Sequence, residues 1–185
     1  MARDGAAAEP GGWPDALAGL PVCPVRRLPV PFSAERDETG RGVFTALDPV
    51  HKEQIIRYRL CGVCGKHMGY WIVFLGDEVS AVPGGIYVDP PMHEECALAA
   101  IEVCPYIKLE RVPRRPLAPQ DVMIAPAGSF DGPKRPWVMA VTRDFKMVPH
   151  RAWGRGPVTL VYQPTRIMRT RRFEYREGRL AEVIP

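Results

Sequence analysis

Two short pairs of metal-ligating residue types constrain the fold of this chain more than any other feature of its sequence. The first pair is Cys61 and Cys64, in C-G-V-C, and the second is His93 and Cys96, in H-E-E-C, with 28 residues between the pairs. The first spacing lets both sulfurs turn toward one ion, and the flanking glycines permit the tight turn that this requires. Residues three apart on a helix lie on one face, so the second pair can point at the same ion. The spacing therefore predicts one structural zinc ion held by all four side chains.

The segments between and around the pairs predict short elements of defined type. Residues 48–60 predict a short helix capped by Asp48, and residues 91–104 predict a second helix that ends before Pro105. Residues 70–76 and 80–88 are rich in aromatic and β-branched residues, and the turn residues between them favour a β-hairpin. A cysteine knuckle, a hairpin and a helix with two ligands in its first turn resemble the treble-clef zinc finger, over residues 59–107.

Other interpretations of these residues stay open. Cys61 and Cys64 have the spacing of a thioredoxin-like redox pair, although such a pair opens a helix after a strand. His93-Glu94-Glu95 matches the H-x-E of zinc deaminases, but here the C-x-x-C comes first and Cys96 is a surplus ligand. HNH nucleases also use treble-clef folds, and His67 would be the general base. Separate buried cysteines and a surface histidine are the plainest alternative.

The remaining cysteines and His67 are not expected to bind the metal. Cys104 lies about two helical turns after Cys96 and is predicted to be a packed side chain, as is Cys23 beside Pro24. His67 follows Cys64 by three residues and is predicted to be a polar neighbour of the site.

Three longer motifs extend the comparison beyond the metal ligands. They are R-L-C-x-V-C-G, P-P-x-H-x-x-C-A-x-x-A-x-x-x-C-P-Y and G-P-V-T-L-V-Y. Together they resemble small uncharacterised Cys/His proteins of actinobacterial and actinobacteriophage genomes. This resemblance spans most of residues 59–162; it implies the zinc site and a phage or mobile-element context, and it brings no known activity.

The organisation of the chain favours one α+β domain. With 21 prolines in 185 residues, long uninterrupted helices are not expected. Residues 1–20 are rich in Ala, Gly and Pro and predict a mobile tail, and residues 21–185 predict the single domain. Within it, residues 108–120 predict a Pro/Arg linker, and residues 121–185 predict antiparallel strands with a turn at Glu177-Gly178.

Basic residues gather toward the C-terminus. Residues 134–185 carry 12 Lys or Arg and 4 Asp or Glu, so their net charge is +8 although that of the whole chain is +4. Arginines and aromatic residues alternate over residues 163–179, a composition that suits contacts with DNA or RNA. We expect the phosphate contacts to come from four arginines: Arg166, Arg169, Arg171 and Arg172. A solvated outer face of the sheet is the alternative for these charges.

The sequence therefore predicts a small, non-enzymatic, zinc-stabilised protein that binds nucleic acid. The alternatives are a small nuclease-like or deaminase-like zinc enzyme and a protein-interaction module. No phosphate-binding or dinucleotide-binding glycine motif is present, so a nucleotide cofactor is not expected. The odd count of five cysteines and the lack of a long apolar segment favour the cytoplasm and no membrane contact.

Overall fold

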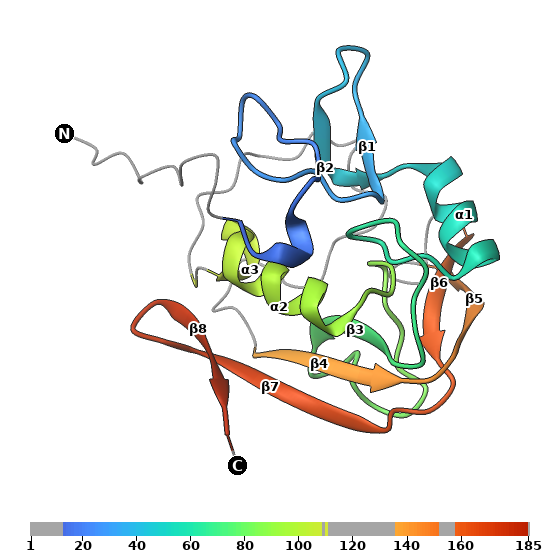
Figure 1. Ribbon diagram of the computed structural model, residues 1–185. Coiled ribbons are helices and arrows are strands. Elements are labelled where there is room, and N and C mark those ends of the chain that lie inside the picture. The colour runs from blue at the N-terminus through green and yellow to red at the C-terminus, as the bar shows by residue number, and fades with distance from the viewer. Residues whose placement is uncertain (1–12, 109, 111–135, 152–157, 185) are drawn as a thin grey trace.

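The computed structural model describes residues 13–108, 110, 136–151 and 158–184 (Figure 1). Its helices and strands follow in chain order: the 3-10 helix η1 Asp15–Leu17, β1 Ala34–Arg36, β2 Gly42–Leu47, α1 Pro49–Tyr58, β3 Ile72–Asp77, α2 Glu94–Val103, α3 Pro105–Lys108, β4 Trp137–Thr142, β5 Phe145–Arg151, β6 Val158–Pro164, β7 Arg169–Arg176 and β8 Arg179–Val183. The strands form three antiparallel sheets: β1 with β2, β5 with β6, and a four-stranded sheet in the order β3-β4-β7-β8. A mixed fold with few helices and antiparallel C-terminal strands was predicted, and the structure confirms it.

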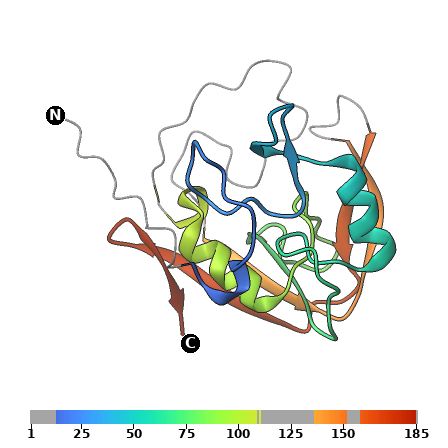
Figure 2. The same ribbon diagram turned by 45° about the horizontal axis from the view of Figure 1, so that its top comes forward.

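The four-stranded sheet lies at the centre of the hydrophobic core. Every residue of β4 is buried, and so are five of the six residues of β3. Helix α2 lies over one face of this sheet, beside β4 and β7 in both views (Figures 1 and 2). On the opposite face, the fully buried Phe74 contacts Tyr87, Phe145 and Tyr162, with ring centroids 4.8, 5.8 and 6.2 Å away. The sheet thus packs on its two faces against different parts of the chain.

The predicted β-hairpin of residues 70–76 with 80–88 is wrong. The first strand forms as β3, but its partner is β4, in a register that pairs Ile72 with Thr142 and Asp77 with Trp137. Residues 80–88 are mostly turns, and within them an isolated bridge joins Tyr87 to Tyr162 of β6. A strand buried on both faces needs an unbroken apolar partner, which β4 supplies and the Pro- and Gly-containing segment does not. The hairpin of a treble clef is therefore missing from this segment.

Both predicted helices form where the sequence places them. Helix α1 begins after Asp48, whose carboxylate accepts hydrogen bonds from the backbone N–H groups of Val50 and His51, at 2.8 and 2.9 Å. Helix α2 begins after His93, three residues later than predicted, and ends at Val103, with Cys104 as its C-cap before Pro105. Acidic residues in the first turn of α2 oppose the positive end of the helix dipole.

The predicted mobile tail is wrong from residue 13 onward. Leu17 of η1 is 5% exposed and belongs to the same core cluster as α2, where Trp13 and Leu20 also pack. Trp13, Leu17 and Leu20 are too few to form a long periodic pattern in the sequence. They are nevertheless enough to anchor one short helix on the core. Residues 1–12 lie outside the described residues, as does the predicted linker apart from Lys108 and Glu110. Among the helices described, none combines the length and the apolar character needed to cross a bilayer.

Candidate metal centre

The first two candidate ligands sit in a tight turn that is closed by backbone hydrogen bonds. An antiparallel bridge joins Leu60 to His67. Inside it, the Cys61 N–H donates to the Lys66 carbonyl at 2.8 Å, and the Gly65 N–H donates to the Cys61 carbonyl at 2.9 Å. Gly65 has a φ of +70°, a conformation that side chains with a Cβ rarely adopt. The predicted turn therefore forms, with a glycine at the position of positive φ.

A second glycine brings the knuckle against the start of α2. The Gly62 N–H donates to the Pro91 carbonyl at 2.8 Å. A Cβ at Gly62 would lie 2.4 Å from Cγ of Pro90, so no other residue fits without a shift. This close approach places the ligands of residues 61–64 opposite the first turn of the helix.

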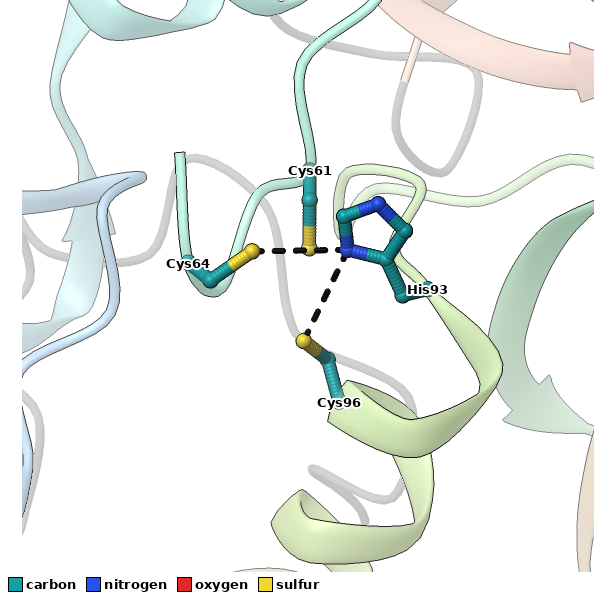
Figure 3. Close-up of side chains that lie close together, drawn as sticks. All are labelled: Cys61, Cys64, His93 and Cys96. Carbon is teal, nitrogen blue, oxygen red and sulfur yellow. Dashed lines mark hydrogen bonds between the residues drawn. The ribbon is translucent and has the colours of Figure 1, made fainter. Parts of the chain in front are cut away.

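The four predicted ligands converge on one point. The ligand atoms of Cys61, Cys64, His93 and Cys96 all lie within 4.8 Å of one another, and their side chains point inward from the knuckle and the helix (Figure 3). Nδ1 of His93 is 3.4 Å from the Cys64 sulfur and 3.8 Å from the Cys96 sulfur. Tetrahedral zinc, with bonds of about 2.3 Å to sulfur and about 2.0 Å to nitrogen, separates its ligand atoms by about 3.5–3.8 Å. These residues are therefore close enough to bind a metal ion, and the donor set suits zinc.

The imidazole of His93 is oriented for coordination through Nδ1. Its Nε2 lies 3.1 Å from the backbone carbonyl oxygen of His67, which can only accept a hydrogen bond. Nε2 therefore carries the proton, and the lone pair of Nδ1 faces the three sulfurs. A backbone carbonyl that fixes the tautomer in this way is a common outer partner of metal-bound histidine. His67 thus contributes its backbone to the site, and its exposed side chain is not part of the ligand cluster.

The environment of the three thiols favours negative charge on the most buried one. A hydrogen bond with Cys96 lowers the pKa of Cys61 to about 5, helped by hydrogen bonds from backbone N–H groups of Cys64, His93 and Val63. The hydrogen bond with Cys61 and burial raise the pKa of Cys96, and burial raises that of Cys64. Without a cation, three adjacent thiolates would repel one another. A divalent metal removes this conflict, since it binds all three in the deprotonated form.

Helix α2, which has two candidate ligands at its start, is tied to the C-terminal strands by ion pairs. Glu94 lies between the ligands His93 and Cys96 in the sequence, and its carboxylate contacts Arg169 at 2.5 Å and Arg171 at 2.9 Å. Arg171 also binds the Glu182 carboxylate of β8 through two hydrogen bonds of 2.7 Å, and this contact lowers the pKa of Glu182. The charges thus connect α2, β7 and β8.

These contacts change the view of the four arginines predicted to bind nucleic acid. Arg169 and Arg171 share one face of β7, as strand alternation predicts, and both are paired with carboxylates. Arg172 points to the other face and pairs with Glu78 and Glu174. Arg166 precedes β7 and has no carboxylate partner among the described residues. Three of the four charges are thus already balanced within the protein, and their contact with nucleic acid stays a prediction.

Replacing Glu94 by Gln is expected to lower the free energy of unfolding by about 1 kcal/mol, because two partly exposed arginines lose their shared carboxylate. Urea unfolding monitored by circular dichroism measures this change. Glu95→Gln is the matched control, because Glu95 lies in the same helical turn but is exposed and has no described ion-pair partner. Equal effects of the two variants would show that helix dipole energy, rather than the ion pairs, accounts for the loss.

Sequence reasoning missed that the knuckle turn occurs twice. An antiparallel bridge joins Val22 to Pro29, the Cys23 N–H donates to the Leu28 carbonyl at 2.9 Å, and the Arg27 N–H donates to the Cys23 carbonyl at 2.7 Å. Arg27 has a φ of +51°, and Gly65, at the matching position of the first turn, also has a positive φ, of +70°. The shared C-x-V in the two segments was the available signal. The second turn has an arginine where the first has Cys64, so Cys23 lacks the paired sulfur and, as predicted, lies outside the ligand cluster.

The comparisons with known proteins leave the centre to be interpreted from its own geometry. No family model matches the chain, and neither the curated proteins nor the solved structures contain a significant match. The resemblance to small actinobacterial and phage proteins therefore stays a prediction.

Proposed function

We propose that the protein is a small, non-enzymatic binding module whose fold is stabilised by one structural zinc ion. The observation that carries this proposal is the closed donor set: three sulfurs and one imidazole nitrogen within 4.8 Å of one another. Four protein ligands complete a tetrahedral zinc site and leave no position for a water molecule or a substrate. The ion would join the knuckle, α2 and, through them, the central sheet.

A catalytic role has less support from the arrangement around the ligands. In the deaminase pattern the general acid and base would be Glu95, which is exposed on the outside of α2. The HNH pattern needs a histidine on a hairpin beside the metal, and that hairpin does not form here. A zinc enzyme with an open coordination position is therefore the alternative, and the number of protein ligands on the bound metal distinguishes the two.

Nucleic acid is the partner that we infer for this module, and the reducing cytoplasm is its expected compartment. The inference rests on the net charge of +8 over residues 134–185 and on exposed arginines and aromatic rings. A protein partner is the second candidate, favoured by exposed apolar residues such as Val79, Val82 and Leu160.

Protein purified without added metal is expected to contain one zinc ion per chain by elemental analysis. Chelation should release the ion and lower the melting temperature, because the free energy of metal binding is part of the free energy of folding. Metal-free protein that melts cooperatively at the same temperature would contradict the proposal.

Substitution with Co²⁺ tests whether the site is closed. Four protein ligands should give the intense visible absorption of tetrahedral cobalt, together with charge-transfer bands from the thiolates. Azide or cyanide added at low concentration should leave this spectrum unchanged. His93→Ala is the matched variant, since it opens one position and should make the spectrum sensitive to added anion. Anion sensitivity in the unaltered protein would favour the enzyme alternative.

A further inference from the structure

One end of the central sheet carries two exposed aromatic rings. Tyr70 and Trp71 come directly before β3 and are 60% and 42% exposed. Their rings meet edge to face, with centroids 4.9 Å apart and an angle of 78° between the planes. Single exposed apolar side chains need no explanation, but two adjacent large aromatic rings are typical of an interaction surface.

An arginine lies against both rings. Arg143 directly follows β4, and because Ile72 pairs with Thr142, the next residues along the two strands, Trp71 and Arg143, lie side by side. The guanidinium carbon of Arg143 is 4.5 Å from the centre of the Tyr70 ring and 5.3 Å from that of Trp71. These contacts are within the range of cation–π interactions and hold the rings in a fixed arrangement.

The chain that leads into β7 adds a second cation at the same end of the sheet. The Thr165 N–H donates to the Asp144 carbonyl at 3.0 Å, so residues 165–168 run beside the end of β4. In this stretch Arg166 is exposed, and Met168 is 41% exposed. The surface thus combines flat rings, a flexible apolar side chain and arginine.

Within the described ranges of the chain, no acidic side chain balances the charge at this surface. No carboxylate of a described residue pairs with Arg143 or Arg166, whereas Arg169 and Arg171, farther along β7, are paired. The carboxylate of Asp144 is already paired with Arg59, at 2.7 Å. The surface is therefore complementary to an anion that also offers flat apolar faces.

We propose that this aromatic platform, formed by Tyr70, Trp71, Arg143, Arg166 and Met168, binds single-stranded nucleic acid. Unpaired bases would stack on the two rings, and the arginines would contact the flanking phosphates. A duplex hides the faces of its bases, so it can use the arginines but not the rings. The inference rests on the proposed function, because it names the partner of the module and the place where that partner binds.

The platform is fixed to the metal centre through the backbone. Val73 of β3 exchanges two hydrogen bonds of 2.9 Å with Met92, the residue before His93. The end of β3 that carries Tyr70 and Trp71 therefore lies beside the start of α2. Zinc at His93 would thus hold both sides of this junction and keep the rings in place for binding.

The test uses the full chain with zinc bound and fluorescein-labelled probes of about 12 nucleotides, in single-stranded DNA, single-stranded RNA and duplex DNA, read by fluorescence anisotropy. Trp71→Ala is expected to weaken single-strand binding by about 5-fold to 100-fold, because the stacking of one base is lost. Arg143→Ala should also reduce the slope of log affinity against log salt by about 0.7, the value for one phosphate contact on a single strand.

Tyr58→Ala is the matched control. Tyr58 is also an exposed tyrosine, 52% exposed, with the Arg57 guanidinium 5.4 Å from its ring centre, but it lies on α1. The Tyr58→Ala protein should bind the probes with the affinity of the unaltered protein. Three results would overturn the inference: no binding at low salt, equal losses for Trp71→Ala and Tyr58→Ala, or tighter binding of the duplex. Zinc content is measured on every variant, so a zinc-loaded protein that binds no probe refutes the platform and leaves the structural metal site standing.

Discussion

Replacing Cys61 by Ser is expected to abolish zinc binding and to leave most of the chain unfolded at room temperature. Cys61 is completely buried in the main core cluster, so its replacement would remove both a metal bond and a well-packed side chain. Structural zinc sites contribute about 10–16 kcal/mol of apparent binding free energy in zinc-finger peptides. Domains of ordinary size have a total stability of about 5–15 kcal/mol. Elemental analysis and urea unfolding measure the two losses.

Two controls separate ligand loss from general damage. Cys104→Ser changes a cysteine at the end of α2, outside the ligand cluster, and should keep one zinc ion per chain. His67→Ala should keep it too, because His93 is oriented by the backbone carbonyl of residue 67 and not by its side chain. A Cys61→Ser protein with full zinc content and an unchanged urea midpoint would refute the assigned ligands, and so would loss of zinc from His67→Ala but not from His93→Ala.

Replacing Phe74 by Ala is expected to lower the free energy of unfolding by about 3–5 kcal/mol while zinc stays bound. The ring is fully buried and packs against three other aromatic rings, from β5, β6 and the segment before α2. The truncation leaves a cavity where the central sheet meets the β5-β6 sheet. Urea unfolding gives the stability, and elemental analysis gives the zinc content.

The exposed Tyr58 again supplies the comparison for Phe74. Tyr58→Ala removes an aromatic ring of similar size from the surface and should change the free energy of unfolding by less than about 0.5 kcal/mol. Loss of zinc from Phe74→Ala would mean that metal binding depends on the packing of the aromatic core. A stability change as small as that of Tyr58→Ala would mean that the core collapses around the deletion.

The cluster of four candidate metal ligands was predictable because the geometry within each pair is local. The two residues between Cys61 and Cys64 fix the first pair, and a helix that begins just after His93 fixes the second, without reference to the rest of the chain. The helix boundaries followed in the same way from Asp48 and Pro105. The close approach of Gly62 to Pro90 brings the two pairs together. The sequence showed the glycine but not its contact with a residue 28 positions away.

The pairing of strands and charges was not predictable, since it depends on residues distant in sequence. The apolar run of β3 has the composition of a strand, but nothing in it specifies β4 rather than the nearer residues 80–88. The arginines of β7 resemble a free basic face in the sequence. In the folded protein Glu94 lies opposite Arg169 and Arg171, so a carboxylate from another element neutralises the charge that the sequence displayed.

The register of β3 against β4 has a consequence for how the chain is made. A ribosome completes the knuckle, β3 and α2 before it begins β4 at Trp137, so β3, with five of its six residues buried in the finished protein, is synthesised long before its partner. An apolar strand with unpaired N–H and C=O groups is prone to pair with other chains. Early capture of a metal ion would order the neighbouring segments during this interval, but it leaves that edge open. We therefore expect a fragment that carries Cys61, Cys64, His93 and Cys96 to fold around these residues only if it also includes β4.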